Sequence, residues 1–287
     1  MGSNLRAIRR KIKAVSSIWQ ITRAMQMVAA SKLKRTQPRV EASRAYLQHL
    51  NGIMRNLAGN VPPDLHPYLQ ERPVGSIGLI VVAGDKGLAG SHNVNILRAA
   101  EQFIASQKVP VKVLTVGIKA ADYARRQGWN VVERLDTPET GNDSRDGSRI
   151  ARRARRMFDD GEIDQLQIAY TQFVSPLRRP PTLFQLLPIV GEEHEAQAVA
   201  EYLFEPPAEE LLAGLLPRTL DAQIVNMLLQ SIAAEHSARM TSMSAATDNA
   251  AELRDSLTRD LNRARQTSIT TELLEVISGA DALAQGG

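Results

Sequence analysis

The sequence predicts an α/β protein with long helices, in which the N- and C-terminal helices form an antiparallel coiled coil with a Rossmann-like α/β domain inserted between them. Two observations lead to this fold. Residues 3–37 and 218–278 contain neither glycine nor proline, and the region between them alternates apolar runs with amphipathic stretches. Globular helices usually run about 8 to 20 residues, and isolated helices are marginal in water. Each long tract therefore needs a partner along its length, and the other tract is the simplest one.

The composition fits a folded, helix-rich chain and excludes several chemistries. Of the 287 residues, 43% are hydrophobic and 23% charged, which are ordinary globular values. Only 4% are aromatic, which favours aliphatic helix seams. There is no cysteine, so disulfides, thiolate catalysis and cysteine-based zinc sites are excluded. No stretch reaches the roughly 18 consecutive apolar residues that a membrane span needs.

The first tract predicts an amphipathic helix that continues beyond a proline. Its apolar residues recur at steps of three or four, at Leu5, Ile8, Ile12, Val15, Ile18 or Trp19, Met25, Val28 and Leu33. Pro38 removes one backbone hydrogen bond, but helix-favouring residues resume over 40–57, so we expect a bent continuation rather than an end. Gly59, Pro62 and Pro63 then stop the helix. The first segment is thus an N-terminal coiled-coil helix over residues 1–58.

The middle of the chain, residues 75–206, predicts an α/β domain. Residues 77–82 form a continuous apolar run that ends in a glycine-bearing turn, which is typical of a buried strand. Strand-like and helix-like stretches then alternate, which indicates a parallel sheet. We expect further strands at 111–116, 131–135, 166–174 and 183–190, helices at 95–107, 119–126 and 149–160, and a loop at 191–217 that leads back to helix.

The last segment, residues 207–287, predicts the second coiled-coil helix. Its seam has coiled-coil periodicity, at Ile224, Leu228, Ile232, Leu253, Leu257, Leu261, Ala264 and Leu274. Between 237 and 251 the seam residues are mostly small, so another helix can approach closely. At about 1.5 Å per residue this tract extends roughly 90 Å, against roughly 50 Å for residues 3–37, so one helix overhangs the other. The overhang implies an external sleeve or a fold-back, because it carries the apolar residues Leu273, Leu274, Val276, Ile277 and Leu283.

Two other functional classes receive weaker support. A nucleotide-binding enzyme is suggested by the glycine loop 84–90, but the loop lacks the Gly-Lys-Ser/Thr ending of a P-loop and the G-x-G-x-x-G spacing of a dinucleotide site. The histidines are scattered, so no metal site or catalytic constellation is predicted. A nucleic-acid protein is suggested by ten cations that precede the first acidic residue, Glu41. The apolar stripe on the same helix argues against this, and a solvated helix face is the simpler explanation.

Four segments carry a resemblance to a known family. They read ITRAMQMVAASKLKRTQ (21–37), GLIVVAGDKGLAGSHN (78–93), EYLFEP (201–206) and ATDNAAELRDSLTRDLNRARQTSITTELLEVISGA (246–280). The first and the last closely resemble the two signature helices of the gamma subunit of F-type ATP synthase. The second is similar to that family's strand and glycine loop, and the third to its foot, which is the α/β domain. The resemblance therefore covers nearly the whole chain in order.

The resemblance implies a central rotor. In this family the paired helices stand inside a ring of three alpha and three beta subunits, while the foot rests with the epsilon subunit on the membrane ring of c subunits. Such a chain transmits torque between ion flow and the catalytic sites on beta, so it is non-catalytic and takes no cofactor or metal. It is also expected to have no nucleic-acid partner, to touch the membrane only through the c ring, and to lie peripherally on the cytoplasmic side of a bacterial plasma membrane.

The resemblance further implies individual contact residues. Met25 is expected near the lever loop of a beta subunit, and Arg265 with Gln266 faces a beta loop that catches the rotor. The other candidates for beta contact are Thr270, Glu272, Glu275 and, with a side chain that reaches across the helices or out to a partner, Arg239. The candidates for contact with the c ring are Tyr202, Phe204 and Glu205. Ordinary coiled-coil surface, and core filling by Met25, are the alternatives.

Overall fold

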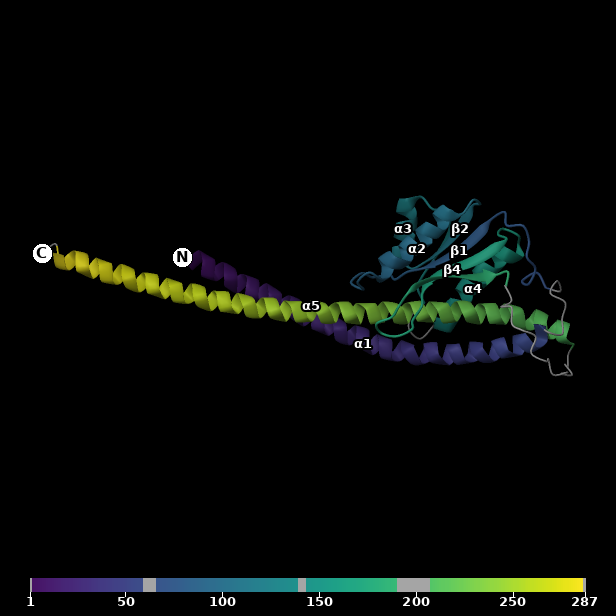
Figure 1. Cartoon of the computed structure of the whole chain (residues 1–287), viewed down its shortest axis with the longest axis horizontal. Helices are drawn as coiled ribbons and strands as arrows, with labels where there is room; N and C mark the ends of the chain where they lie inside the picture. The colour runs from purple at the N-terminus through teal and green to yellow at the C-terminus, as the bar shows by residue number, and fades with distance from the viewer. Residues whose placement is uncertain (1, 59–65, 139–142, 190–206, 286–287) are drawn as a thin grey trace. The chain divides into compact units, whose positions relative to one another are not determined.

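The computed structural model describes residues 2–58, 66–138, 143–189 and 207–285, and the chain divides into two compact units. One unit combines Met1–Val28 with Met240–Gly287, and the other is Ala29–Arg239. Two long helices, α1 (Gly2–Ala58) and α5 (Ala208–Gln285), contribute to both units (Figure 1). The units therefore cut across the helices, and the division into segments 1–58, 75–206 and 207–287 stays a prediction.

In the first unit, α1 and α5 run antiparallel, as predicted. The guanidinium of Arg254 lies over the Trp19 ring, 5.7 Å from its centroid, and the Thr247 hydroxyl donates to Thr22 Oγ1 at 2.9 Å. Residue numbers rise along α5 as they fall along α1, which fixes the antiparallel direction. The buried side chains on this part of α5 include Met243, Thr247 and Ala250, and two of these three are small, so the helices approach closely there.

The buried Thr22–Thr247 hydrogen bond is expected to couple the two helices. Thr247→Val leaves the Thr22 hydroxyl without one partner, so we expect a loss of about 1 kcal/mol in the free energy of unfolding. The double variant Thr22→Val/Thr247→Val should lose less than the two single losses added together, because neither hydroxyl is then left unpaired. Urea unfolding followed by Trp19 fluorescence, in a Trp129→Phe background, measures both values. Strictly additive losses would show that the two hydroxyls are not coupled.

Both long helices run through a proline. The helix α1 continues past Pro38, as predicted. The helix α5 begins at Ala208 and includes Pro217, so the loop predicted for residues 191–217 is wrong from Ala208 onward. The physical reason is burial: Leu212, Leu216 and Leu220 lie one turn apart and are fully buried. Burying each leucine is worth about 2 kcal/mol, which together exceeds the roughly 3 kcal/mol cost of one interior proline.

The second unit contains a five-stranded sheet in the order β3-β2-β1-β4-β5. Its elements are β1 (Ile77–Val82), α2 (His92–Ser106), β2 (Val111–Val116), α3 (Ile118–Gln127), β3 (Val131–Leu135), α4 (Asp143–Asp159), β4 (Gln165–Thr171) and β5 (Pro181–Leu187). The strand β1 pairs in parallel with β2 and β4, and β2 with β3, as predicted. The strand β5 is antiparallel to β4, so the prediction of a fully parallel sheet is wrong at this edge. Residues 172–180 contain no helix and are too short for a parallel crossover.

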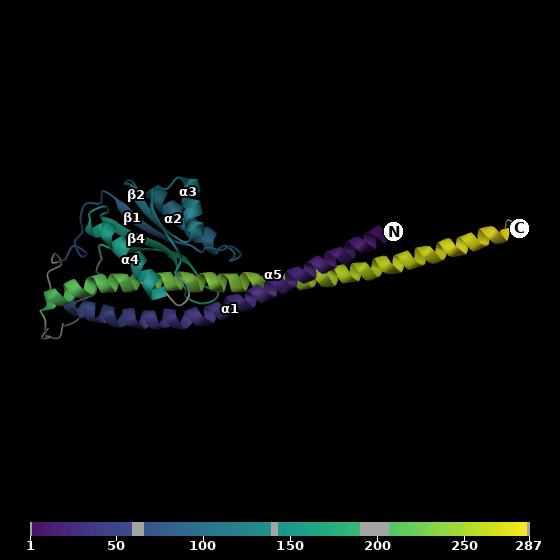
Figure 2. The ribbon, with the colours of Figure 1, turned by 180° about the vertical axis from the view of Figure 1, so that it is seen from behind.

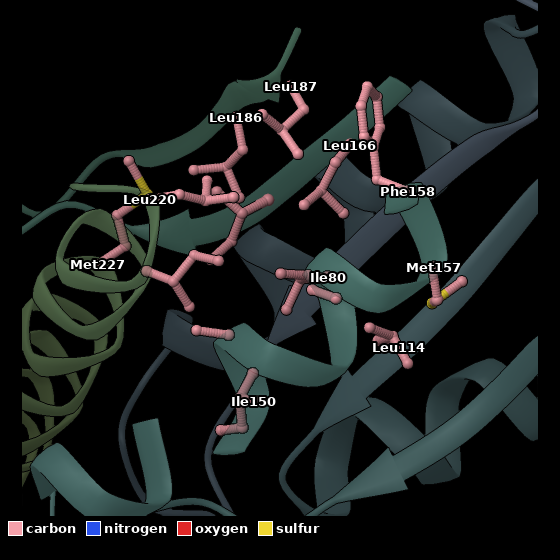
Figure 3. Close-up of a cluster of buried hydrophobic side chains, with 14 of the residues drawn as sticks. Ile80, Leu114, Ile150, Met157, Phe158, Leu166, Leu186, Leu187, Leu220 and Met227 are labelled. Atoms are coloured by element: carbon pink, nitrogen blue, oxygen red, sulfur yellow. The ribbon is translucent and has the colours of Figure 1, made fainter. Parts of the chain in front are cut away.

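Helices cover both faces of the sheet. Figures 1 and 2 show α2 and α3 on one face, and α4 with the first part of α5 on the other. On the second face, Ile80 and Leu114 of the strands pack with Phe158 of α4 and Leu220 of α5 (Figure 3). The strand β1 is buried on both sides, because Ile80 faces this core while Leu79 faces the other. Burial on both sides explains why β1 reads as an uninterrupted apolar run.

Candidate functional site

The last part of α5, in the first unit, carries a set of exposed polar side chains. The predicted contact residues here are all exposed: Arg265, Gln266, Thr270, Glu272 and Glu275. The Thr270 hydroxyl donates to the carbonyl of Gln266 one turn earlier, at 3.0 Å. Within the part of the chain that the structure describes, the side chains of Arg265 and Glu275 make no hydrogen bond or ion pair. Their charges are therefore free to interact with another molecule.

Large apolar side chains are exposed along the same stretch. Leu273 and Leu274 each expose 58% of their surface, Ile277 exposes 55%, and Val276 exposes 70%. Scattered apolar residues are normal on a protein surface, but a contiguous group indicates an interface. The helix runs unbroken to Gln285, so the described residues do not fold back over this group. The fifth predicted member, Leu283, lies outside the residues whose side chains are described.

The other two candidates for beta contact are less exposed. Met25 is half-buried on α1 in the first unit. Arg239 belongs to the second unit, where it forms an ion pair with Glu235 and donates to the carbonyls of Lys86 and Gly87 at 3.4 and 3.2 Å. Only 12% of its side chain is exposed. The structure therefore gives Arg239 internal partners, and its predicted contact with a beta subunit stays a prediction.

The glycine loop after β1 is filled by the protein's own groups. The carboxylate of Asp85 accepts the backbone N–H of Ile118, at the start of α3, at 2.9 Å, and the hydroxyl of Thr137 at 3.1 Å. A bound phosphate would need such an N–H group at a helix start, and it would meet a carboxylate here. The Gly84 N–H is likewise taken, by Asn93 Oδ1 at 2.9 Å. The geometry thus disfavours the nucleotide-binding alternative. Across the described residues, no group of three or more His, Cys, Asp or Glu side chains is arranged to hold a metal ion.

A cluster of two buried histidines and nearby cations, which sequence reasoning missed, lies beside this loop. His92 starts α2 and His236 lies on α5, and each is only 7% exposed. Burial is the larger cause that lowers the pKa of both imidazoles to about 4, and nearby cations contribute the rest: Arg179 and Arg239 for His92, and Lys32 and Arg239 for His236. Both histidines are therefore neutral near pH 7. The sequence gives no signal for this cluster, because its members come from four separate elements.

Two arginines of α4 form ion pairs with neighbouring elements and do not simply face the solvent. Arg153 donates to Glu133 of β3 at 2.8 Å, and Arg155 to Asp221 of α5 at 3.1 Å. Two of the arginines in 152–156 therefore tie α4 to its neighbours, which the run of charges alone does not reveal. The predicted foot residues Tyr202, Phe204 and Glu205 lie outside the described residues. Across the helices that are described, none has a stretch long and apolar enough to cross a bilayer.

Comparison with known proteins agrees with this arrangement. The family model for ATP synthase matches residues 4–283, which defines the chain as a subunit of that class. The ATP synthase gamma chain of Dehalococcoides mccartyi is 43% identical, covering 98% of this chain and 100% of the relative. That of Desulfitobacterium hafniense is 40% identical, covering 98% and 99%. The chain belongs to the ATP synthase gamma chain family, whose members are rotor subunits of an enzyme with catalysis on other subunits.

Solved structures show the same fold. In cryo-EM structures of the Euglena gracilis mitochondrial ATP synthase, a chain of the rotor matches with a TM-score of 0.69 at 16% identity, covering 94% of this chain and all of that one. A chain of the OSCP/F1/c-ring structure matches with a TM-score of 0.72 at 17% identity, covering 100% and 96%. At these identities the match supports the architecture of long helices and an α/β domain.

Proposed function

We propose that this chain turns within a ring of three alpha and three beta subunits and passes torque between a c ring and the catalytic sites on beta. The observation that carries the proposal is the end of α5, where unpaired charges and exposed apolar side chains share one helix. An asymmetric rotor favours one state of each catalytic site only if its contacts differ among the orientations. Unpaired charges such as Arg265 supply that contrast. The apolar residues give a surface with few directional bonds.

The contact residues follow from this proposal. Arg265, Gln266, Thr270, Glu272 and Glu275 would meet beta subunits, together with Met25 on the neighbouring helix. Tyr202, Phe204 and Glu205 would meet the c ring, beside the epsilon subunit. The family relationship supports these assignments, and the Tetrahymena thermophila structure described as central stalk and c-ring contains a chain of similar fold. No cofactor or nucleic acid is part of the proposal.

The proposed location follows from the partners. The relatives named above are bacterial proteins, so we place this chain on the cytoplasmic side of a bacterial plasma membrane. It would be a peripheral protein that reaches the membrane only through the c ring.

Co-assembly tests the proposal directly. When the chain is mixed with alpha and beta subunits of the same organism, we expect a complex that contains one copy of it, detected by native mass spectrometry. Recovery of the chain alone would overturn the proposal. Binding to generic DNA that persists at physiological ionic strength would instead favour the nucleic-acid alternative, since non-specific electrostatic binding weakens steeply with salt.

A further inference from the structure

Helix α5 holds the glycine loop, which we define as residues 84–90, through a pair of charged side chains. Arg239 donates to the loop carbonyls of Lys86 and Gly87 and also to the carboxylate of Glu235 one turn earlier. Both side chains are nearly buried, with 12% and 11% of their surface exposed. The guanidinium fork is suited to this task, because one group binds a carboxylate and two carbonyls at once.

The loop approaches α5 so closely that a side chain at its first residue would displace the Glu235 carboxylate. A Cβ atom added at Gly84 would lie 2.6 Å from the Glu235 carboxyl carbon, well inside contact distance. Further along the loop, Leu88 has a φ of 63°, which is strained for a branched side chain, and it is 62% exposed. Backbone strain of this kind persists only where neighbouring contacts hold it. Glu235 and Arg239 provide those contacts from one side.

The same stretch of α5 is also hydrogen-bonded to the end of β4 and to the turn that follows. Ser231 Oγ accepts the N–H of Thr171 at 2.9 Å, and Gln230 Oε1 accepts the N–H of Phe173 at 3.3 Å. About two helical turns beyond them, the Ser237 hydroxyl donates to the carbonyl of Pro176 at 2.9 Å. The bond of Arg239 to the glycine loop is the last of this series, and Arg239 is also the last residue of the second unit. The polar residues within 230–239 thus hold several sides of α5 by hydrogen bonds, and we call them the polar seam, in contrast to the apolar packing earlier on α5.

We propose that Glu235 and Arg239, which we call the lock, are positioning residues that hold the α/β domain and α5 in a fixed relative orientation. A torque applied to one is then transmitted to the other. The inference rests on the proposed rotor function, but it gives Arg239 an internal role in place of contact with a beta subunit. Hydrogen bonds are directional, whereas apolar packing tolerates sliding, so a polar seam resists rotation of the helix against the sheet. Each partner also neutralises the other, and removing one leaves a nearly buried charge unpaired.

Hydrogen exchange on the isolated full chain tests the lock by itself. We expect Arg239→Gln and Glu235→Gln each to speed exchange of the amides in residues 84–91 roughly tenfold, since a charge-assisted hydrogen bond is lost. Arg218→Gln removes an exposed arginine from the same helix in the same unit and should change nothing there. Exchange at the wild-type rate in both lock variants would overturn the proposal. If neither folds, Gly84→Ala displaces the Glu235 carboxylate from the other side and should give the same increase.

Assembled complexes then test the role in transmission. In the complex with alpha, beta and the membrane ring, we expect the lock variants to lower the ratio of ions moved to ATP hydrolysed, whereas Arg218→Gln keeps it. An unchanged ratio with faster loop exchange would overturn the transmission role. Failure of the wild-type chain to assemble would instead count against the proposed rotor function, and the exchange result distinguishes the two failures.

Discussion

Replacing Arg265 and Gln266 together by alanine is expected to reduce ATP synthesis by the assembled complex roughly thirtyfold while leaving the fold intact. Truncating a central interface residue costs about 2 kcal/mol, which corresponds to that factor. Both side chains are exposed, and the Arg265 guanidinium has no partner within the described residues. The lost interaction would therefore be one with a beta subunit, and it would act in only some orientations of the rotor.

The fold should survive because both positions lie inside α5 and alanine is the best helix former. Circular dichroism of the isolated chain should accordingly be unchanged. Arg259→Ala/Asn262→Ala is the matched control, since it removes one charge and one amide from exposed positions on the same helix. Synthesis and hydrolysis at wild-type rates in the Arg265/Gln266 variant would remove these residues from the torque pathway. Equal losses in the control would show that any change on this part of the helix is harmful.

The long helices and most strands are predictable because their signals are local. The absence of glycine and proline in residues 3–37 and 218–278, and the doubly buried run at 77–82, each reflect the environment of one element. The start of α5 was not predictable, because Pro217 usually breaks a helix and only the buried leucine row overrides it. The direction of β5 was missed for a similar reason, since the strand pattern itself carries no direction.

The candidate site likewise combines a feature that the sequence predicts with one that it does not. The apolar row near Leu274 was predicted from periodicity and unequal helix length, and in the structure its described side chains are exposed. The partners of Arg239 were not predictable, because Gly87 lies 152 residues away in the sequence. Its surroundings of small residues suggested a side chain that reaches across the helices or out to a partner, whereas in the fold it contacts the glycine loop. Contacts of this range come from sheet topology, which no local pattern encodes.

The buried histidines lead to the second large effect, a loss of stability in mild acid. His92 and His236 are neutral in the folded chain, with pKa values of about 4, but in the unfolded chain they titrate near their ordinary value of about 6.5. Between these values the unfolded state binds more protons, so stability is complete above pH 6.5 and falls as the pH drops toward 4. Between pH 7.5 and pH 5, each histidine should lower the free energy of unfolding by about 2 kcal/mol.

Urea unfolding at the two pH values measures this loss. Trp129 lies in the second unit against Tyr123, so its fluorescence in a Trp19→Phe background reports on the unit that holds both histidines. We expect His92→Gln/His236→Gln to flatten the dependence between pH 7.5 and 5, while His49→Gln, at an exposed position, keeps it. An equally steep dependence in the double variant would assign the acid sensitivity to other groups. The lock beside the glycine loop should loosen only as the pH approaches 4, because protonation of His92 and His236 in the folded chain then adds positive charge near Arg239.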